Sequence, residues 1–360
     1  MIISIHKLFL LKKFIKKIFL VSIIFFILVM IINLIEEANF LKESETSFLT
    51  PILLTTLNAP SLLYEMFPFI FLISTQFFFI EIFENKEIYT LRQFGIDNFS
   101  LLKFLSLSSF LLGFIIIIIF YNFSSILKNE YLKIKNNFAG DKKYLAVITK
   151  NGIWIKDNLD NGIMVINSDK IDGEFLINSS ITKFDKDFKI QENIISNKIN
   201  IKNFEWVLYD VIVTDLNNVS KKLDKITLTS NFDLERINNL FSDLSSLTYF
   251  ELLKLEKDYE AIGYSVDEIN IQKHKFYSLP ILLSVMTIMA SIIMFYNKFK
   301  KNLMYNLFIG IFFSVSVYYL SHFSSLLGEN GKLPLILSIW FPVIILMSLS
   351  FIGIIRLNEK

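Results

Sequence analysis

The segment 84–97, which reads ENKEIYTLRQFGID, is the part of the chain whose residue types and spacing point most clearly to chemistry. Residues three apart share a face of an α-helix, so a helix here would gather three apolar side chains with two charged ones beside them: Ile88, Leu91, Phe94, Glu87 and Arg92. A short amphipathic helix of this kind suits docking into a groove of a partner protein. Alternatively, the segment is a solvated connector that lies on lipid headgroups. Under both interpretations, the segment is predicted to make non-covalent contacts.

Two residues predict where this helix stops and where the next helix starts. Gly95 suits the left-handed conformation that commonly closes a helix. Asp97 has the short acceptor side chain that caps the first turn of a helix. We therefore expect a coupling helix over 84–95, followed directly by a longer helix.

Covalent catalysis has little support in the residue types. The chain has no cysteine, and its three histidines (His6, His274 and His322) stand far apart, which argues against a cysteine nucleophile and a zinc site. It has no Gly-x-x-x-x-Gly-Lys-Ser/Thr loop, so the sequence offers no ATP site. We expect a chain that is not an enzyme and needs no cofactor. Any energy it uses must then come from a separate subunit.

Six apolar runs would position the segment, arranged as two groups of three. The chain is 53% hydrophobic, and a membrane-spanning helix needs about 20 mostly apolar residues. The runs cover 18–35, 62–83, 101–123, 277–296, 303–323 and 333–355. The first run has the basic start of a signal peptide, but no small-residue cleavage site follows it, so we interpret it as an anchor. The predicted fold class is an α-helical membrane protein with six transmembrane helices.

The charges around these runs predict an orientation. Basic residues precede the first run and fill the loop after the fourth, whereas the loop after the first run is acidic: Lys7, Lys12, Lys13, Lys16 and Lys17; Lys298, Lys300 and Lys301; Glu36, Glu37, Glu43 and Glu45. Cytoplasmic loops carry the excess of Lys and Arg. Both termini and the segment 84–97 are therefore predicted to be cytoplasmic, and the long insert 124–276 lies on the other side.

The insert has the pattern of a β domain. Its 21 Lys+Arg and 23 Asp+Glu nearly balance, which argues against a nucleic-acid surface. Turn signals at 151–152 and 160–162 separate β-rich runs. We expect short strands at 144–149, 152–156, 163–167, 174–178, 180–184, 198–204, 205–214 and 225–228. Strands spaced near ten residues apart predict an all-β sandwich or jelly roll.

Two helices are predicted to close the insert. Thr248-x-x-Glu251 and Ser265-x-x-Glu268 both fit a capping box, in which a hydroxyl and a carboxylate each satisfy a free amide. The second helix should continue into the fourth apolar run. The predicted domains are thus 1–123, with the first three spans, 124–276, and 277–360, with the last three.

The motif Glu87-Ile-x-x-Leu-Arg-x-x-Gly-Ile resembles the cytoplasmic motif of the LptF/LptG lipopolysaccharide export permeases. Similar pieces follow in the family's order over nearly the whole chain: 60–68 (PSLLYEMFP), 151–157 (NGIWIKD), 206–210 (WVLYD), 279–280 (LP) and 328–334 (GENGKLP). The strand with Trp154 and the helical lead into the fourth span are more similar to LptG than to LptF.

The resemblance implies the permease subunit of an ABC-type lipopolysaccharide exporter in the bacterial inner membrane. It implies an LptF-like paralogue, an LptB-like ATPase dimer, and LptC/LptA-like regulator and bridge proteins as partners, with lipopolysaccharide and membrane lipids and no nucleic acid. The insert would be a periplasmic jelly roll that passes the lipid onward. Glu87 would be the carboxylate that meets the ATPase, with Ile88, Leu91, Arg92 and Gly95 shaping the helix.

For the lipid path we expect Asn33, Phe67, Phe312 and Tyr318. At the outer end of the first span and the start of the fifth, LptG relatives often carry basic residues for lipid phosphates; this chain has Asn33, Glu36, Glu37 and Asn306, although Lys42 could compensate. The identity of the lipid therefore stays open. Gln76, deep in the second span, is expected to hydrogen-bond across helices.

Two other functions stay open beside the LptG-like one. The chain could be the LptF-type half of the same transporter. It could also be a membrane-anchored periplasmic binding module whose helices only hold the β domain, which predicts no ATPase partner. An intramembrane hydrolase is disfavoured, because no nucleophile and base stand together.

Overall fold

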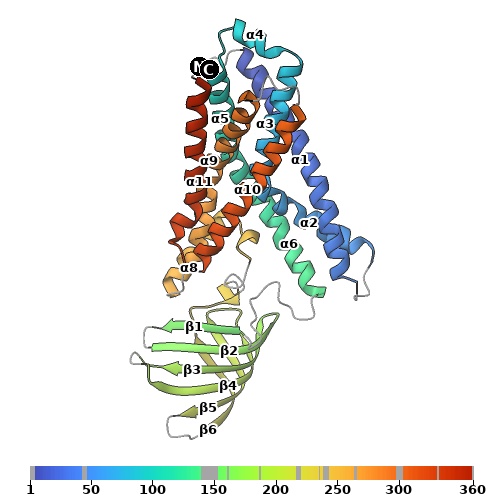
Figure 1. Ribbon diagram of the computed structural model, residues 1–360. Helices are drawn as coiled ribbons and strands as arrows, with labels where there is room; N and C mark the ends of the chain where they lie inside the picture. Colours follow the sequence, from blue (N-terminus) through green and yellow to red (C-terminus); the bar gives the residue numbers. More distant parts are fainter. Residues whose placement is uncertain are drawn as a thin grey trace. The chain divides into compact units, whose positions relative to one another are not determined.

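The computed structural model describes residues 5–42, 47–138, 153–159, 162–185, 188–215, 220–234, 236–237, 243–262, 266–296, 303–330 and 332–358. The chain forms two compact units. One comprises Met1–Tyr131 and Asp267–Lys360, and the other comprises Leu132–Val266. The first unit is helical and the second carries a β-sheet (Figure 1).

The helical elements run as α1 (Ile5–Phe40), α2 (Leu49–Glu65), α3 (Phe67–Glu84), α4 (Glu87–Gln93), α5 (Asn98–Ile115), the π-helical turn η1 (Ile116–Tyr121), α6 (Asn122–Phe138), α9 (Asp267–Tyr296), α10 (Leu303–Glu329) and α11 (Leu335–Asn358). Among the described residues, six helical stretches are long and apolar enough to cross a membrane: His6–Phe40, Phe67–Glu84, Asn98–Lys135, Asp267–Tyr296, Met304–Gly328 and Leu335–Leu357. Each overlaps one predicted run, so the prediction of six helices in two groups of three is confirmed.

The bounds of two predicted spans were wrong. The run 62–83 is not one helix, because α2 ends at Glu65 and α3 begins at Phe67. Pro68 explains the break: it has no amide hydrogen to donate back into a continuing helix, and it fits the first turn of a new one. The first helix starts at Ile5, well before the apolar run at 18–35.

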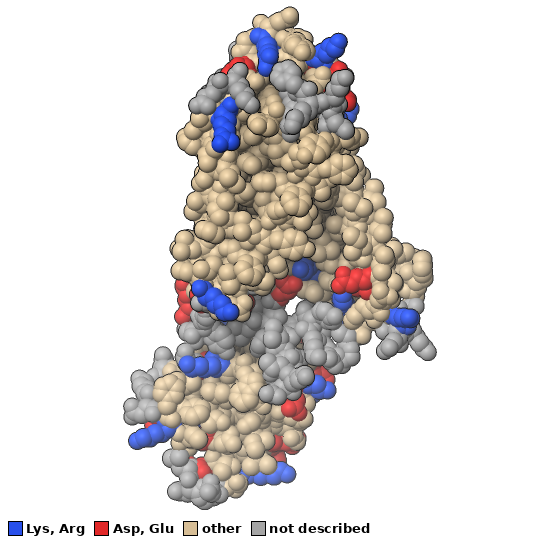
Figure 2. Space-filling view, viewed as in Figure 1, with Lys and Arg blue, Asp and Glu red and all other residues tan. Residues whose placement is uncertain are grey.

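Charged side chains mark the two ends of the helical unit. In Figure 2 the visible Lys, Arg, Asp and Glu residues of this unit gather at its ends, and the broad band between them is uncharged on this face. The start of α1 and the end of α11 lie at the same end of the helical unit as α4 (Figure 1). This distribution is what a bilayer requires of a bundle that crosses it.

Small and polar residues let the helices approach closely. The α5–α9 contact pairs Ser109 with Thr287 at 2.7 Å. A Cβ added to Gly113 would lie 2.7 Å from the backbone of Pro280, so only glycine fits there. Gln76 of α3 donates to the backbone carbonyl of Asn306 in α10 at 2.7 Å, which confirms its predicted hydrogen bond across helices.

The second unit holds one antiparallel sheet whose strands follow chain order: β1 (Ile153–Leu159), β2 (Gly162–Asp172), β3 (Phe175–Phe184), β4 (Ile190–Asn200), β5 (Glu205–Asp215) and β6 (Ser220–Thr229). Its apolar core includes the fully buried Trp206, whose indole N–H donates to the carbonyl of Phe232 at 2.7 Å. The inserted β structure is therefore confirmed. The jelly-roll arrangement and the periplasmic position stay predictions.

Several predicted elements of the insert need comment. The strands predicted at 174–178 and 180–184 are one strand, β3, and the strand predicted at 198–204 lies earlier, as β4. The capping box of α8 (Tyr249–Ile262) is confirmed, because the Thr248 amide donates to Glu251 at 2.7 Å. The prediction that a helix continues into the fourth span is confirmed by α9. The strand predicted at 144–149 and Ser265 lie outside the described residues.

One line crosses the sheet where the alternation of buried residues breaks in every strand from β2 to β5, and it continues into β6. Buried positions alternate along each strand, then skip two residues at this line, as between Leu208 and Val211 of β5. The residues on the line have no cross-strand partner in the pairing register: Asp169, Asn178, Asn197, Asp210 and Asp224. Buried serines replace lost ladder bonds, since the Ser196 hydroxyl donates to the Tyr209 carbonyl at 2.7 Å. We call this line the crease.

Candidate functional site at the junction of α1, α3 and α4

The short helix α4 begins and ends through local backbone chemistry. Lys86, at φ 57°, takes the left-handed conformation and turns the chain from α3 into α4. At the other end Gly95 has φ 76°, its amide donates to Arg92, and the amide of Ile96 donates to Leu91, both at 3.0 Å. These two bonds form a Schellman motif. The left-handed cap predicted at Gly95 is confirmed.

The next helix starts as predicted at Asp97. Its carboxylate accepts from the Ser100 amide at 3.1 Å and caps α5. Hydrogen bonding from Ser100 lowers the pKa of Asp97, against a smaller opposing effect of burial. The loop from Glu84 to Asp97 is thus bounded by caps on both sides, which fixes the position of α4.

The apolar face of α4 packs against its own bundle. Ile88 and Leu91 are 3% and 6% exposed and share a core cluster with Leu10 and Phe14 of α1. Phe94 was expected on the same face, but it is 59% exposed. The helix ends at Gln93, and Phe94 belongs to the cap that turns the chain away. The buried pair therefore anchors α4 to the chain that carries it.

The outward face of α4 presents polar and aromatic surface. Tyr89 is 58% exposed, and Arg92 is exposed and donates to Asn98 at 3.2 Å. Glu87, at the start of the helix, is half-buried at 26% exposure. A partner that contacts α4 thus meets Tyr89, Arg92 and one edge of Glu87 rather than Ile88 or Leu91.

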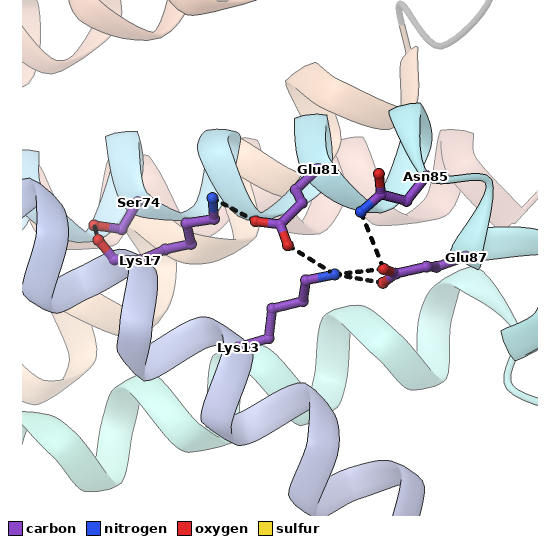
Figure 3. Close-up of polar contacts among 6 residues, drawn as sticks. All are labelled: Lys13, Lys17, Ser74, Glu81, Asn85 and Glu87. Atoms are coloured by element: carbon purple, nitrogen blue, oxygen red, sulfur yellow. Dashed lines mark hydrogen bonds and ion pairs between the residues drawn. The ribbon is translucent and has the colours of Figure 1, made fainter.

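Glu87 belongs to an ion-pair network that links three helices (Figure 3). Lys13 of α1 contacts both carboxylate oxygens of Glu87 at 2.6 Å and Glu81 of α3 at 3.0 Å. Lys17, one turn further along α1, pairs with the other oxygen of Glu81. The Asn85 amide donates to Glu87 at 3.2 Å. Two lysines and two carboxylates therefore neutralise one another at the junction of α1, α3 and α4.

Sequence analysis missed the lysines and Glu81 as parts of this site. Lys13 and Lys17 were used only as two of the basic residues before the first apolar run, from which the orientation is predicted. Their spacing of four places them on one face of a helix, which was the available signal. What the sequence could not show is that this face meets the last turn of α3 and the first residue of α4.

The geometry describes a short helix fixed between two candidate membrane spans, with Tyr89 and Arg92 exposed on its outward face. In the described residues, no group of three or more His, Asp or Glu side chains could hold a metal ion. The family described as "Lipopolysaccharide export system permease LptF/LptG" matches residues 8–356. The chain belongs to this family. No individual curated protein matches the chain at a significant level.

Membership of the LptF/LptG family makes the chain a transport component of the membrane and assigns it to lipopolysaccharide export. The family match covers both units and α4, so it applies to the chain as a whole. It does not separate LptG from LptF.

The four residues expected on the lipid path of this LptF/LptG permease differ in exposure. Asn33 is 1% exposed, and Asn58 of α2 donates to it at 3.3 Å. Phe67 is buried among aromatic rings of the helical core. Phe312 and Tyr318 are exposed on α10, where Tyr318 stacks on His322. In this conformation, only the α10 pair presents surface to a lipid or a partner.

The polar residues at the end of α1 also turn inward in part. Glu37 is fully buried and accepts from the Tyr131 hydroxyl at 2.7 Å, whereas Glu36 is exposed. Asn306, at the start of α10, is 1% exposed. Glu37, Asn33 and Asn306 therefore serve helix packing here, and Glu36 is the exposed carboxylate at the end of the first span.

Proposed function

We propose that this chain is the LptG-like permease half of an ABC-type exporter that extracts lipopolysaccharide from the inner membrane and passes it to a periplasmic bridge. The observation that carries the proposal is the position and the packing of α4. It is a short helix between two spans, fixed to its own bundle by Ile88 and Leu91 and open outward at Tyr89 and Arg92. A helix held in this way transmits a push from a partner into the membrane bundle.

The proposed mechanism is mechanical. An ATPase dimer contacts Glu87 and the outward face of α4, and its closure on ATP moves the helix. Because Gly95 and Asp97 join α4 to α5 without a loose loop, the movement reaches α5 directly. The cavity between this chain and its paralogue then closes and drives the lipid toward the β domain.

The proposed placement follows from charge. The basic start of α1 lies at the same end of the helical unit as α4 (Figure 1), and basic loops favour the cytoplasm. Domain 124–276 would then lie in the periplasm, where its apolar interior, lined by residues such as Ile166 and Leu208, receives acyl chains. LptC/LptA-like proteins would take the lipid from there.

Co-purification of the ATPase subunit tests the proposal. Glu87→Ala and the surface variant Arg92→Glu should each lower recovery of the ATPase, since both residues face the proposed contact. Lys103→Ala, an exposed change on α5, is the matched control. Leu91 is a poor choice because it is buried, so its loss would test folding. Unchanged recovery with both α4 variants would remove the main support for the exporter.

Two alternatives have distinct outcomes in the same experiment. A membrane-anchored binding module recovers no ATPase, even as the unaltered chain. An LptF-type half recovers the ATPase together with a paralogue that is itself LptG-like in sequence. The strand with Trp154 and the continuous α9 favour the LptG-like half.

A further inference from the structure

The first three turns of α1 lie beside α4 and precede the apolar run of the first span. The helix begins at Ile5, whereas the run begins at residue 18. Leu10 and Phe14 from this extension are buried in the same cluster as Ile88 and Leu91 of α4. The extension therefore shares one apolar core with the coupling helix.

A ring contact adds a second point of attachment. The imidazole of His6 lies against the ring of Phe94, with centroids 4.2 Å apart. His6 is in the first turn of α1, and Phe94 is in the cap that ends α4. The contact of His6 with Phe94 and the contact of Lys13 with Glu87 thus lie at the two ends of α4.

Lys13 adds an ion pair to these contacts. Among the described ion pairs, it is the residue that joins both Glu87 and Glu81. It bridges Glu87 and Glu81, and it is only 11% exposed. Without it, two carboxylates would face one another beside Lys17, which pairs with Glu81 alone in the described contacts. Removing one partner of a shielded ion pair leaves an uncompensated charge, which costs more than losing a surface pair.

We propose that Lys13 is a positioning residue that ties α4 to α1 through Glu87 and Glu81, so that α1 moves with α4 when a partner displaces it. The proposal rests on the proposed function, because it concerns the path of the movement that the ATPase starts. It makes the first membrane helix a direct recipient of that movement, beside α3 and α5.

The first test compares two lysines of α1 in the full transporter, purified with its partner subunits and placed in proteoliposomes with lipopolysaccharide. Lys13→Gln should lower lipopolysaccharide released per ATP hydrolysed by roughly five- to tenfold, the lower range of coupling between sites. ATPase recovery and ATP hydrolysis should persist. Lys12→Gln removes the same charge from an exposed position and should leave the ratio unchanged. Lys13→Arg should restore it.

The outcomes separate this proposal from the proposed function. If the unaltered chain recovers no ATPase, the proposed function fails first. If it recovers the ATPase and Lys13→Gln keeps the wild-type ratio of lipid to ATP, the tie between α1 and α4 is wrong while the exporter stands.

A crosslink gives a test that does not depend on how well Lys13→Gln folds. The chain has no cysteine, so His6→Cys with Phe94→Cys supplies the only two thiols, at positions whose rings are in contact. A short bismaleimide should join them and leave transport unchanged, because α1 and α4 move together. Transport that stops on crosslinking, with each single cysteine variant active, would show that α4 leaves α1 during the cycle and would overturn the proposal.

Discussion

Gly95 controls the end of the coupling helix through its backbone alone. It has φ 76°, and no atom lies within 4 Å of the position that a Cβ would occupy. A substitution there tests conformation without a steric clash. The same residue closes a Schellman motif, so its conformation sets the direction in which the chain leaves α4.

We predict that Gly95→Ala lowers the free energy of unfolding by about 1 kcal/mol, because alanine pays for the left-handed conformation that glycine adopts freely. Gly95→Asn should cost less, since asparagine tolerates this region better. Thermal unfolding of the detergent-solubilised chain measures both. Equal losses for alanine and asparagine would mean that something other than backbone conformation holds the turn.

Asp97 allows a prediction with a pH dependence. Asp97→Ala should lower stability by about 1 kcal/mol at neutral pH, as the loss of an N-cap does. The hydrogen bond from Ser100 lowers the pKa of Asp97, so the carboxylate is favoured in the folded chain. Its contribution is therefore complete above the unfolded pKa of about 3.9 and is lost as the pH falls through the lower folded value.

The measurement compares unfolding of the wild type and Asp97→Ala between pH 7 and the acid limit of the protein. The difference should shrink only below about pH 3.9. Asp97→Asn keeps an acceptor at the cap and should stay close to the wild type at pH 7. A difference that already disappears near pH 6 would assign the effect to another group.

At the scale of elements, helices were easier to predict than strands. The six membrane helices follow from apolar runs alone, because a bilayer leaves no other way to satisfy the backbone. The break at Met66 and the early start of α1 were missed, since one depends on Pro68 and the other on packing against α4. The contacts of Lys13 were equally hidden, because they join positions far apart in sequence.

The crease explains why the strands were misread. Strand prediction relies on strict alternation of buried and exposed residues. In β3, alternation breaks at Asn178, where φ is 52°, so the strand looked like two short ones. In β4 the same break at Asn197 left only the half after it visible. The pairing register continues unshifted across the crease, but the break in the alternation of buried residues defeats reasoning from a period of two.

The crease predicts effects of different size for two substitutions at one position. Asn178→Val should lower stability by about 1–2 kcal/mol, because a β-branched residue resists positive φ. Asn178→Gly should stay within about 0.5 kcal/mol of the wild type, since freedom of the backbone offsets the loss of the exposed bond to Asp169.

Unfolding of the sheet can be followed by the fluorescence of the buried Trp206 in a full chain whose other two tryptophans, Trp154 and Trp340, are replaced by Phe. Asn197→Val serves as a control at a crease position with no positive φ recorded, and it should cost less than Asn178→Val. If valine were tolerated equally at both positions, the left-handed turn would not be what sustains the crease.

At the scale of the whole molecule, the helical unit and the β unit have different surfaces. The helical unit exposes apolar side chains along its length and charges at its ends, which suits a bilayer (Figure 2). The β unit instead packs one apolar core, leaves some apolar side chains such as Trp154 and Ile195 exposed, and carries lysines on its edge strand, as at Lys221 and Lys222 of β6. Edge lysines discourage pairing with other strands in water.

We predict that α4 and the β unit lie on opposite sides of the membrane. Because the chain has no cysteine, one introduced thiol reports its own position without background. Tyr89→Cys on α4 and Thr227→Cys on β6 replace exposed residues outside the predicted spans. An impermeant maleimide should label Thr227→Cys in intact spheroplasts and Tyr89→Cys only in inverted vesicles, because the basic start of α1 predicts that α4 is cytoplasmic. Labelling of both thiols from the same side would overturn the proposed orientation, and with it the contact between α4 and a cytoplasmic ATPase.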